Sequence, residues 1–142
     1  MKRLEGKVAL VSGTARGQGR AAALRFAAEG ALVVGGDLLH EEAVETQRLI
    51  AREGGIALTP GPLDVTDEES VRSWVDEAAD AFGGIDIVYA NAGAVCFGSI
   101  DGQPYADFSF TLRAELSPSA PISVRSTPPT SRSATRTATS SR

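Results

Sequence analysis

Cysteine, histidine and lysine are all scarce in this chain of 142 residues, and each scarcity excludes a class of site. The single cysteine, Cys96, cannot form a disulfide within the chain, and a lone thiol is typical of a reducing compartment. The single histidine, His40, cannot form the His/Cys clusters that bind zinc, so no metal site is predicted. No apolar run approaches the roughly 18 residues that cross a bilayer, and Met1-Lys2-Arg3 is not followed by the apolar stretch of a secretory signal. We therefore expect a cytoplasmic protein with no membrane partner.

Positive charge is also in deficit, since 14 Lys and Arg side chains face 18 Asp and Glu, for a net charge of −4. The acidic excess lies in the first 113 residues, because the end of the chain carries several arginines and a single acid, Glu115. An acidic fold offers no basic surface to a phosphate backbone, so no nucleic-acid partner is predicted. The arginines near the end are Arg125, Arg132, Arg136 and Arg142.

Short apolar runs alternate with longer segments of helical periodicity along most of the chain. This alternation implies a parallel sheet with right-handed crossovers and helices on both faces. The fold class is therefore α/β, with strand order 3-2-1-4, the N-terminal half of a Rossmann-type doubly wound sheet. The predicted strands cover residues 7–12, 31–36, 56–59 and 85–90, and the predicted helices cover 18–29, 41–53, 67–82 and 104–116.

The third predicted helix shows both its start and its buried face in the sequence. Thr66-Asp67-Glu68-Glu69 has the form of a capping box, with Thr66 as the N-cap and Glu69 three residues later. Gly83 ends the helix. The apolar residues that recur at helical spacing are Val71, Trp74, Val75, Ala78, Ala79 and Phe82.

A glycine-rich turn joins the first predicted strand to the first predicted helix. The glycines of the turn, Gly13, Gly17 and Gly19, are spaced G-x-x-x-G-x-G, which allows a tight turn and a close approach of backbone to a ligand. The N-terminus of the helix that follows offers unpaired N–H groups and a partial positive charge, so the turn predicts a diphosphate site. No Lys-Ser/Thr follows the last glycine, which excludes a Walker-type loop. The alternative is a strand–helix turn that binds no ligand.

An acid stands just after the second predicted strand. The carboxylate of Asp37 can accept hydrogen bonds from the ribose hydroxyls of an adenosine and would repel a 2′-phosphate, which favours NAD over NADP. Arg16 in the glycine turn argues for NADP, because a basic side chain there could reach a 2′-phosphate. Asp37 carries more weight, so NAD is the expected cofactor. The alternative interpretation of Asp37 is an ordinary turn acid.

Four motifs in register resemble those of the short-chain dehydrogenase/reductases, over residues 4 to about 113. They are Ser12-Gly13-x-x-x-Gly17-x-Gly19, Asp37, Asp64-Val65 and Asn91-Ala92-Gly93, of which the last three follow the second, third and fourth predicted strands.

The resemblance implies a role for each motif. It places Asp64 at the adenine amino group, Val65 in the adenine pocket, and Asn91, Ala92 and Gly93 on the ribose side. The cofactor-binding residues predicted from the turn and the resemblance are Ser12, Gly13, Arg16, Gly17, Gln18, Gly19, Asp37, Asp64, Val65, Asn91, Ala92 and Gly93.

The activity that the resemblance implies is hydride transfer between NAD(P) and a small alcohol or carbonyl. Family members use a Ser and a Tyr-x-x-x-Lys, in which Lys lowers the pKa of the Tyr that exchanges a proton with substrate. In this chain lysine stands only at Lys2 and Lys7 and tyrosine only at Tyr89 and Tyr105, so no Tyr-x-x-x-Lys exists. We assign no catalytic residue and expect this polypeptide to be inactive alone.

The end of the chain departs from the family. From residue 114 it consists almost wholly of Ser, Thr, Arg, Pro and Ala, with too few apolar side chains to offset the entropy of ordering. We predict a dinucleotide-binding half-domain over residues 1–113 and a disordered low-complexity tail over 114–142. An abrupt change of this kind is what a shifted reading frame in GC-rich DNA would give.

Three hypotheses therefore stay open. The chain derives from an NAD(P)-dependent oxidoreductase but is inactive alone, or it is a non-catalytic adenine-nucleotide-binding module, or it is a non-functional truncated fragment. The family is usually homo-oligomeric, and we expect this chain to lack most of that interface.

Overall fold

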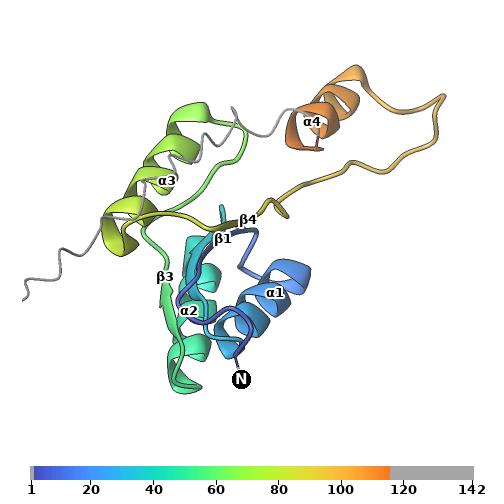
Figure 1. Cartoon of the computed structure of the whole chain (residues 1–142). Helices are drawn as coiled ribbons and strands as arrows, with labels where there is room; N and C mark the ends of the chain where they lie inside the picture. Colours follow the sequence, from blue (N-terminus) through green and yellow to red (C-terminus); the bar gives the residue numbers. More distant parts are fainter. Residues whose placement is uncertain (1, 116–142) are drawn as a thin grey trace, which may run out of the picture.

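Residues 2–115 are described by the computed structural model, and they form a parallel sheet with helices on both faces (Figure 1). The strands lie in the order β3-β2-β1-β4, and every neighbouring pair is parallel. The predicted α/β class and the 3-2-1-4 order are confirmed. The elements are β1 (Val8–Ser12), α1 (Gly17–Ala28), β2 (Leu32–Gly36), α2 (His40–Arg52), β3 (Ile56–Leu58), α3 (Glu68–Phe82), β4 (Ile87–Tyr89) and α4 (Tyr105–Glu115).

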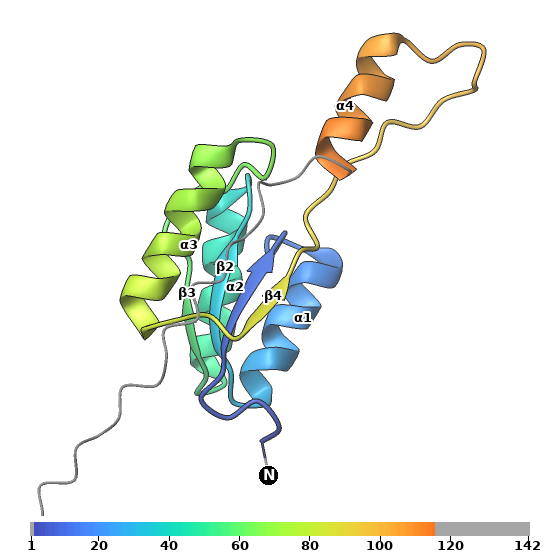
Figure 2. The ribbon, with the colours of Figure 1, turned by 45° about the horizontal axis from the view of Figure 1, so that its top comes forward.

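Strand β1 lies inside the sheet and is buried along its whole length. Val8 and Leu10 belong to the apolar cluster on the face that α3 covers, whereas Ala9 and Val11 belong to the cluster on the face of α1 and α2. Figure 2 shows α3 on one side of the sheet and α1 on the other. Because side chains alternate along a strand, only a continuous apolar run can fill both layers, as the sequence of β1 does.

Helix α3 buries the face that its apolar spacing predicts. Val71, Trp74 and Ala78 are buried against the sheet, and the Trp74 indole N–H donates to the carbonyl of Gly35 at 3.1 Å. The helix ends at Gly83, whose φ of 82° is the left-handed conformation that glycine adopts at least cost.

The N-cap of α3 differs from the prediction, which was wrong by one residue. The cap is Asp67, whose carboxylate accepts a hydrogen bond from the N–H of Glu69 at 3.1 Å. The Thr66 hydroxyl instead donates to Oδ1 of Asp64 at 2.7 Å. Thr66 is thus held by the turn that precedes the helix, and the next residue caps it.

Two carboxylates fasten the N-terminal segment to the amino edge of the sheet. Glu29 accepts from the guanidinium of Arg3 and from its backbone N–H, each at 3.1 Å, and these bonds lower the pKa of Glu29 to about 2. Asp86 accepts from the N–H of Val8 at 2.9 Å and from the Lys7 ammonium at 3.1 Å, which holds the pKa of Asp86 below its ordinary value. Both groups stabilise the fold in the ionised form.

Helix α4 lies apart from the sheet at the end of a long loop (Figures 1 and 2). A helix is predicted here and is found, but several of its large apolar side chains are exposed: Tyr105 is 80% exposed and Phe108 is 51% exposed, whereas Ala114 is buried. Of the predicted tail, Ala114 and Glu115 continue α4, and the remainder lies outside the described residues. Across the same described part of the chain, each helix is too short or too polar to cross a bilayer.

Candidate functional site

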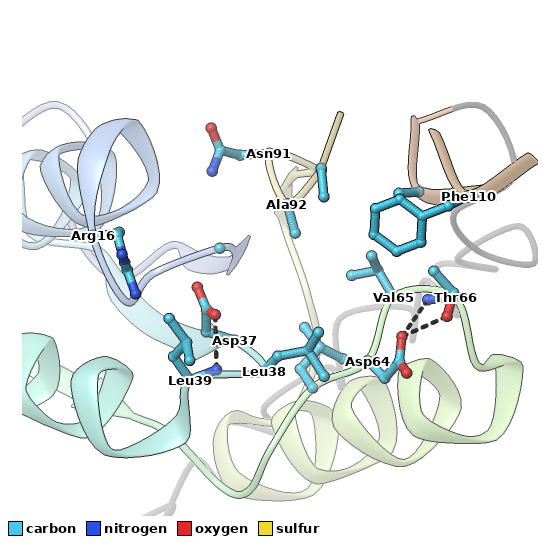
Figure 3. A pocket seen from close by; sticks show the side chains of 15 residues that line it. Arg16, Asp37, Leu38, Leu39, Asp64, Val65, Thr66, Asn91, Ala92 and Phe110 are labelled. Atoms are coloured by element: carbon cyan, nitrogen blue, oxygen red, sulfur yellow. Dashed lines mark hydrogen bonds between the residues drawn. The ribbon is translucent and has the colours of Figure 1, made fainter. Parts of the chain in front are cut away.

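The loops that follow the four strands meet at the carboxyl edge of the sheet, where they line a cavity of about 410 Å³. The carboxyl ends of parallel strands share one edge, and ligands of such sheets bind where the strand order reverses, here between β1 and β4. Figure 3 shows Arg16 and Asp37 at one end of this cavity, and Val65 and Phe110 at the other. Charged and apolar side chains alternate along the cavity, since Leu38 and Leu39 lie beside Asp37, and Asp64 lies beside Val65 (Figure 3).

The three glycines of the turn after β1 meet two geometric demands, a left-handed backbone and a close approach to neighbouring residues. Gly13 and Gly17 have φ values of 79° and 57°, in the left-handed region. A Cβ on Gly13 or on Gly19 would stand 2.7 Å from the side-chain amide nitrogen of Asn91, and a Cβ on Gly19 would also overlap the carbonyl of Gly13, whereas a Cβ on Gly17 would meet nothing within 4 Å. Gly13 and Gly19 thus allow the start of α1 to approach the turn after β4, and Gly17 serves the bend alone.

Ser12 ends β1 and joins it to the turn after β4. Its hydroxyl oxygen accepts from the N–H groups of Asn91 and Ala92, each at 3.0 Å, and its carbonyl accepts from the Asn91 side-chain amide at 3.1 Å. The ladder between β1 and β4 ends at Val11 and Tyr89. The Ser12 bonds therefore extend the contact between the two strands into the site.

Asp37 is half-buried and lines the cavity at the end of β2. Its Oδ2 accepts from the N–H of Ala15 and its Oδ1 accepts from the N–H of Leu39, each at 3.0 Å. Asp37, which is expected to bind a ribose, thus also holds the glycine turn in place. Each carboxylate oxygen has two lone pairs, so Asp37 can still accept a hydrogen bond from a ligand hydroxyl.

Asp64 and Val65 stand in the turn before α3. The Oδ1 of Asp64 accepts from the N–H of Thr66 at 2.9 Å and from its hydroxyl at 2.7 Å, which fixes the carboxylate at the cavity wall (Figure 3). Val65 is half-buried and supplies an apolar wall beside it.

The N-terminus of α1 is electrostatically suited to an anion. Its N-cap, Arg16, makes no side-chain cap bond, and its first turn contains no acid, whereas α2 and α3 both carry glutamates in their first turns. The N–H groups of the first turn of a helix carry partial positive charge and need acceptors. Arg16 itself pairs with Glu42 at 3.3 Å, with both side chains largely exposed.

Most of the predicted site residues line the cavity, and four of them do not. Ser12 and Gly19 are buried behind the cavity wall, where they shape the turn, and Gly17 and Gln18 are exposed at the start of α1 without lining the cavity. The predicted residues that line the cavity are Gly13, Arg16, Asp37, Asp64, Val65, Asn91, Ala92 and Gly93.

Several lining residues carry no motif and are not predicted from the sequence. Leu38 and Leu39 line the cavity and are 66% and 43% exposed. An apolar pair directly after an acid, where a polar turn is usual, is a signal that could have found them. Leu63 and Phe110 also line the cavity, and no spacing rule relates Phe110 to the glycine turn.

Comparison with known proteins agrees with this geometry. The family model described as short chain dehydrogenase matches residues 7–133. The chain belongs to this family. It is 46% identical over 93 residues to an uncharacterized oxidoreductase of Bacillus subtilis, covering 66% of this chain and 34% of that protein. It is 40% identical over 114 residues to a 3-alpha-(or 20-beta)-hydroxysteroid dehydrogenase of Mycobacterium tuberculosis, covering 80% of this chain and 42% of that protein.

Solved structures of short-chain dehydrogenases share the fold of most of this chain. One from Burkholderia cenocepacia, in complex with NADP, is 41% identical with a TM-score of 0.73, covering 79% of this chain and 46% of that one. One from Mycobacterium marinum is 34% identical with a TM-score of 0.75, covering 78% of this chain and 44% of that one. The chain thus spans less than half the length of these relatives. Family membership indicates a nicotinamide dinucleotide as the cofactor.

Proposed function

We propose that this chain binds NAD as the cofactor-binding part of a short-chain dehydrogenase/reductase that acts on an alcohol or carbonyl. The observation that carries the proposal is the cavity at the carboxyl edge of the sheet. It brings together the glycine turn, Asp37, the Asp64–Val65 turn and the turn that begins at Asn91. The first two are the segments that bind the diphosphate and a ribose in a doubly wound sheet, and the family resemblance assigns the other two to the adenine and the ribose side.

The residues present fit the diphosphate of such a cofactor. Gly13 and Gly19 leave no room for a Cβ because they pack against Asn91, and this close packing holds the start of α1 beside the cavity. That helix begins without a capping side chain or an acid. The N–H groups of its first turn are therefore the donors that we assign to the diphosphate.

The charges of Asp37 and Arg16 support NAD over NADP. Asp37 lines the cavity, and its carboxylate would repel a 2′-phosphate while accepting a ribose hydroxyl. Arg16, which could favour NADP, is paired with Glu42 at 3.3 Å, and this partner offsets its positive charge.

Bound NAD would supply the hydride acceptor, and the residues of this chain would bind and orient it. The sequence contains no Tyr-x-x-x-Lys, whose acid–base chemistry is worth about 10²–10⁴-fold in rate. We therefore propose that the 142-residue polypeptide binds the cofactor without turnover. The lone Cys96 supports a cytoplasmic location for it.

A non-functional fragment is a second candidate, favoured by one observation. The aromatic side chains of α4 and the loop before it are exposed, with Phe97 at 93% and Tyr105 at 80%. Apolar surface of this kind promotes aggregation. A monodisperse chain that unfolds cooperatively would contradict this candidate.

Calorimetric titration of the full chain with NAD, NADP and ADP-ribose tests the proposal. We expect NAD to bind more tightly than NADP, and Asp37→Asn to reduce that preference several-fold, with Asp80→Asn as an exposed control. Absence of binding would contradict the proposed function, and tighter binding of NADP would contradict the preference. Formation of NADH from NAD and a secondary alcohol, followed by absorbance, would contradict the absence of turnover.

A further inference from the structure

The peptide group between Thr14 and Ala15, termed here the turn peptide, is held at both ends by residues far away in the sequence. Its carbonyl oxygen accepts from the Thr46 hydroxyl of α2 at 2.6 Å. Its N–H donates to Oδ2 of Asp37 at 3.0 Å. Because a trans peptide is planar and its C=O and N–H point in opposite directions, two partners on opposite sides fix its orientation. This peptide lies in the glycine turn itself.

The Thr46 hydroxyl is committed to the turn rather than to its own helix. Thr46 is 1% exposed, and its oxygen lies 3.3 Å from the carbonyl of Glu42 in the same helix, compared with 2.6 Å from that of Thr14. A threonine inside a helix commonly bonds the carbonyl four residues earlier. The single hydroxyl proton goes to the nearer oxygen, so this side chain connects α2 to the turn.

Arg20 completes the connection from α1. Its Nε donates to the Thr46 oxygen at 2.8 Å, and its guanidinium donates to the Glu42 carbonyl at 3.1 Å. Arginine has donors but no acceptor, so Thr46 must accept from Arg20 and donate to Thr14. The donor and acceptor of each hydrogen bond from Arg20 through Thr46 to Thr14 are therefore fixed. This series of bonds ends on the turn peptide.

We propose that Thr46 and Arg20 are positioning residues for the dinucleotide, acting through the turn peptide without contacting the ligand. The proposal rests on the proposed function, since it assumes that the glycine turn receives the diphosphate. It predicts a distinctive pattern, because NAD, NADP and ADP-ribose share the diphosphate. Loss of the Thr46 hydroxyl should weaken the binding of all three ligands by a similar factor. Asp37→Asn, in contrast, should change the ratio of the affinities for NAD and NADP.

Four variants of the full chain test this role. Thr46→Val keeps the shape of the side chain and removes the hydroxyl, whereas Thr46→Ser keeps the hydroxyl. Arg20→Lys keeps the positive charge near the helix N-terminus and removes the Nε donor. Thr59→Val is the matched control, since Thr59 is also a buried threonine, but among residues 2–115 the partners of the turn peptide are Thr46 and Asp37.

The first readout is the affinity for ADP-ribose, measured by calorimetry on protein shown to be folded by circular dichroism. We expect Thr46→Val to weaken binding by about threefold to tenfold, the worth of one such hydrogen bond. Thr46→Ser and Thr59→Val should bind like the unmodified chain, and Arg20→Lys should lie between. A folded Thr46→Val protein that binds ADP-ribose as tightly as the unmodified chain would overturn the proposal, even if its stability is lower.

The second readout needs no nucleotide. Hydrogen exchange of the Ala15 amide, followed by NMR, should be several-fold faster in Thr46→Val than in Thr46→Ser, because the turn peptide can then rotate. If the unmodified chain fails to bind ADP-ribose, the proposed function fails, and the exchange of Ala15 still tests the positioning. Equal exchange in the two variants would overturn it.

Discussion

Replacement of Ser12 by alanine tests the contact that joins β1 to the turn after β4. Ser12 is 5% exposed, and its hydroxyl oxygen is the acceptor for the N–H groups of Asn91 and Ala92, each at 3.0 Å. Alanine keeps the volume and the strand but removes that oxygen. Both N–H groups then lose their acceptor, while the bond between the Ser12 carbonyl and the Asn91 amide stays.

The structure sets the size of the effect. A buried donor that loses its partner costs about 1–3 kcal/mol, and the lower end applies because Asn91 and Ala92 are half-buried and water can reach them. For the two donors together we expect a loss of about 2 kcal/mol in the free energy of unfolding. That is a large share of the roughly 5–15 kcal/mol that stabilises a domain.

Urea denaturation followed by far-ultraviolet circular dichroism measures this loss. With a denaturant dependence of about 2 kcal/mol per molar urea, the midpoint should fall by roughly 1 M. Ser73→Ala is the matched control, because the Ser73 hydroxyl bonds Glu77 on the exposed surface of α3, and its loss should cost less than about 0.5 kcal/mol. If the two variants unfold at the same urea concentration, Ser12 does not hold β1 to β4.

Three further predictions concern acid, the glycine turn and α3. The pKa of Glu29 is lowered to about 2, so stability should fall as the pH drops from about 4.5 towards 2, and Glu29→Gln but not Asp80→Asn should flatten that fall in acid titrations. Gly19→Ala brings a Cβ within 2.6 Å of backbone in the turn and should weaken NAD binding more than tenfold in calorimetry, whereas Gly61→Ala, with nothing within 4 Å, should be neutral. Trp74→Phe removes one buried hydrogen bond and part of a buried ring, so it should lower the urea midpoint by an amount equivalent to at least about 1 kcal/mol; an unchanged midpoint would show that neither stabilises the fold.

The sequence predicts the architecture of this chain well because that architecture depends on local patterns. Strands such as β1, buried on both faces, need continuous apolar residues, and glycines end the helices between them. The strand order is the one expected for a doubly wound sheet, in which right-handed crossovers place helices on both faces. The cap of α3 could not be chosen in this way, because Thr66 and Asp67 are both good caps. The choice depends on a hydrogen bond that Thr66 makes to Asp64.

The candidate site is predictable only where it rests on motifs. Asp37 and Asn91 are found because each follows a strand whose carboxyl end must reach the common edge. Thr46 and Arg20 carry no such signal, since the bond from Thr46 to Thr14 connects residues 32 positions apart and depends on how two helices pack. The exposure of α4 could likewise not be predicted, because its apolar residues recur at the spacing that is typical of a buried helix.

The pairing of β4 with β1 has a consequence for the order in which the protein folds. Val8 pairs with Leu32 across a short β-α-β connection, but Ala9 pairs with Ile87, after three helices and two strands have intervened. Closing the longer loop, between β1 and β4, costs about 1 kcal/mol more in chain entropy. The β1–β4 pairing that offsets this cost is also shorter than the β1–β2 pairing. We expect β4 to dock last and detach first, as a region of low protection in native-state hydrogen exchange. The binding cavity, one wall of which follows β4, would then open while the other strands stay paired, and a bound nucleotide would slow that opening.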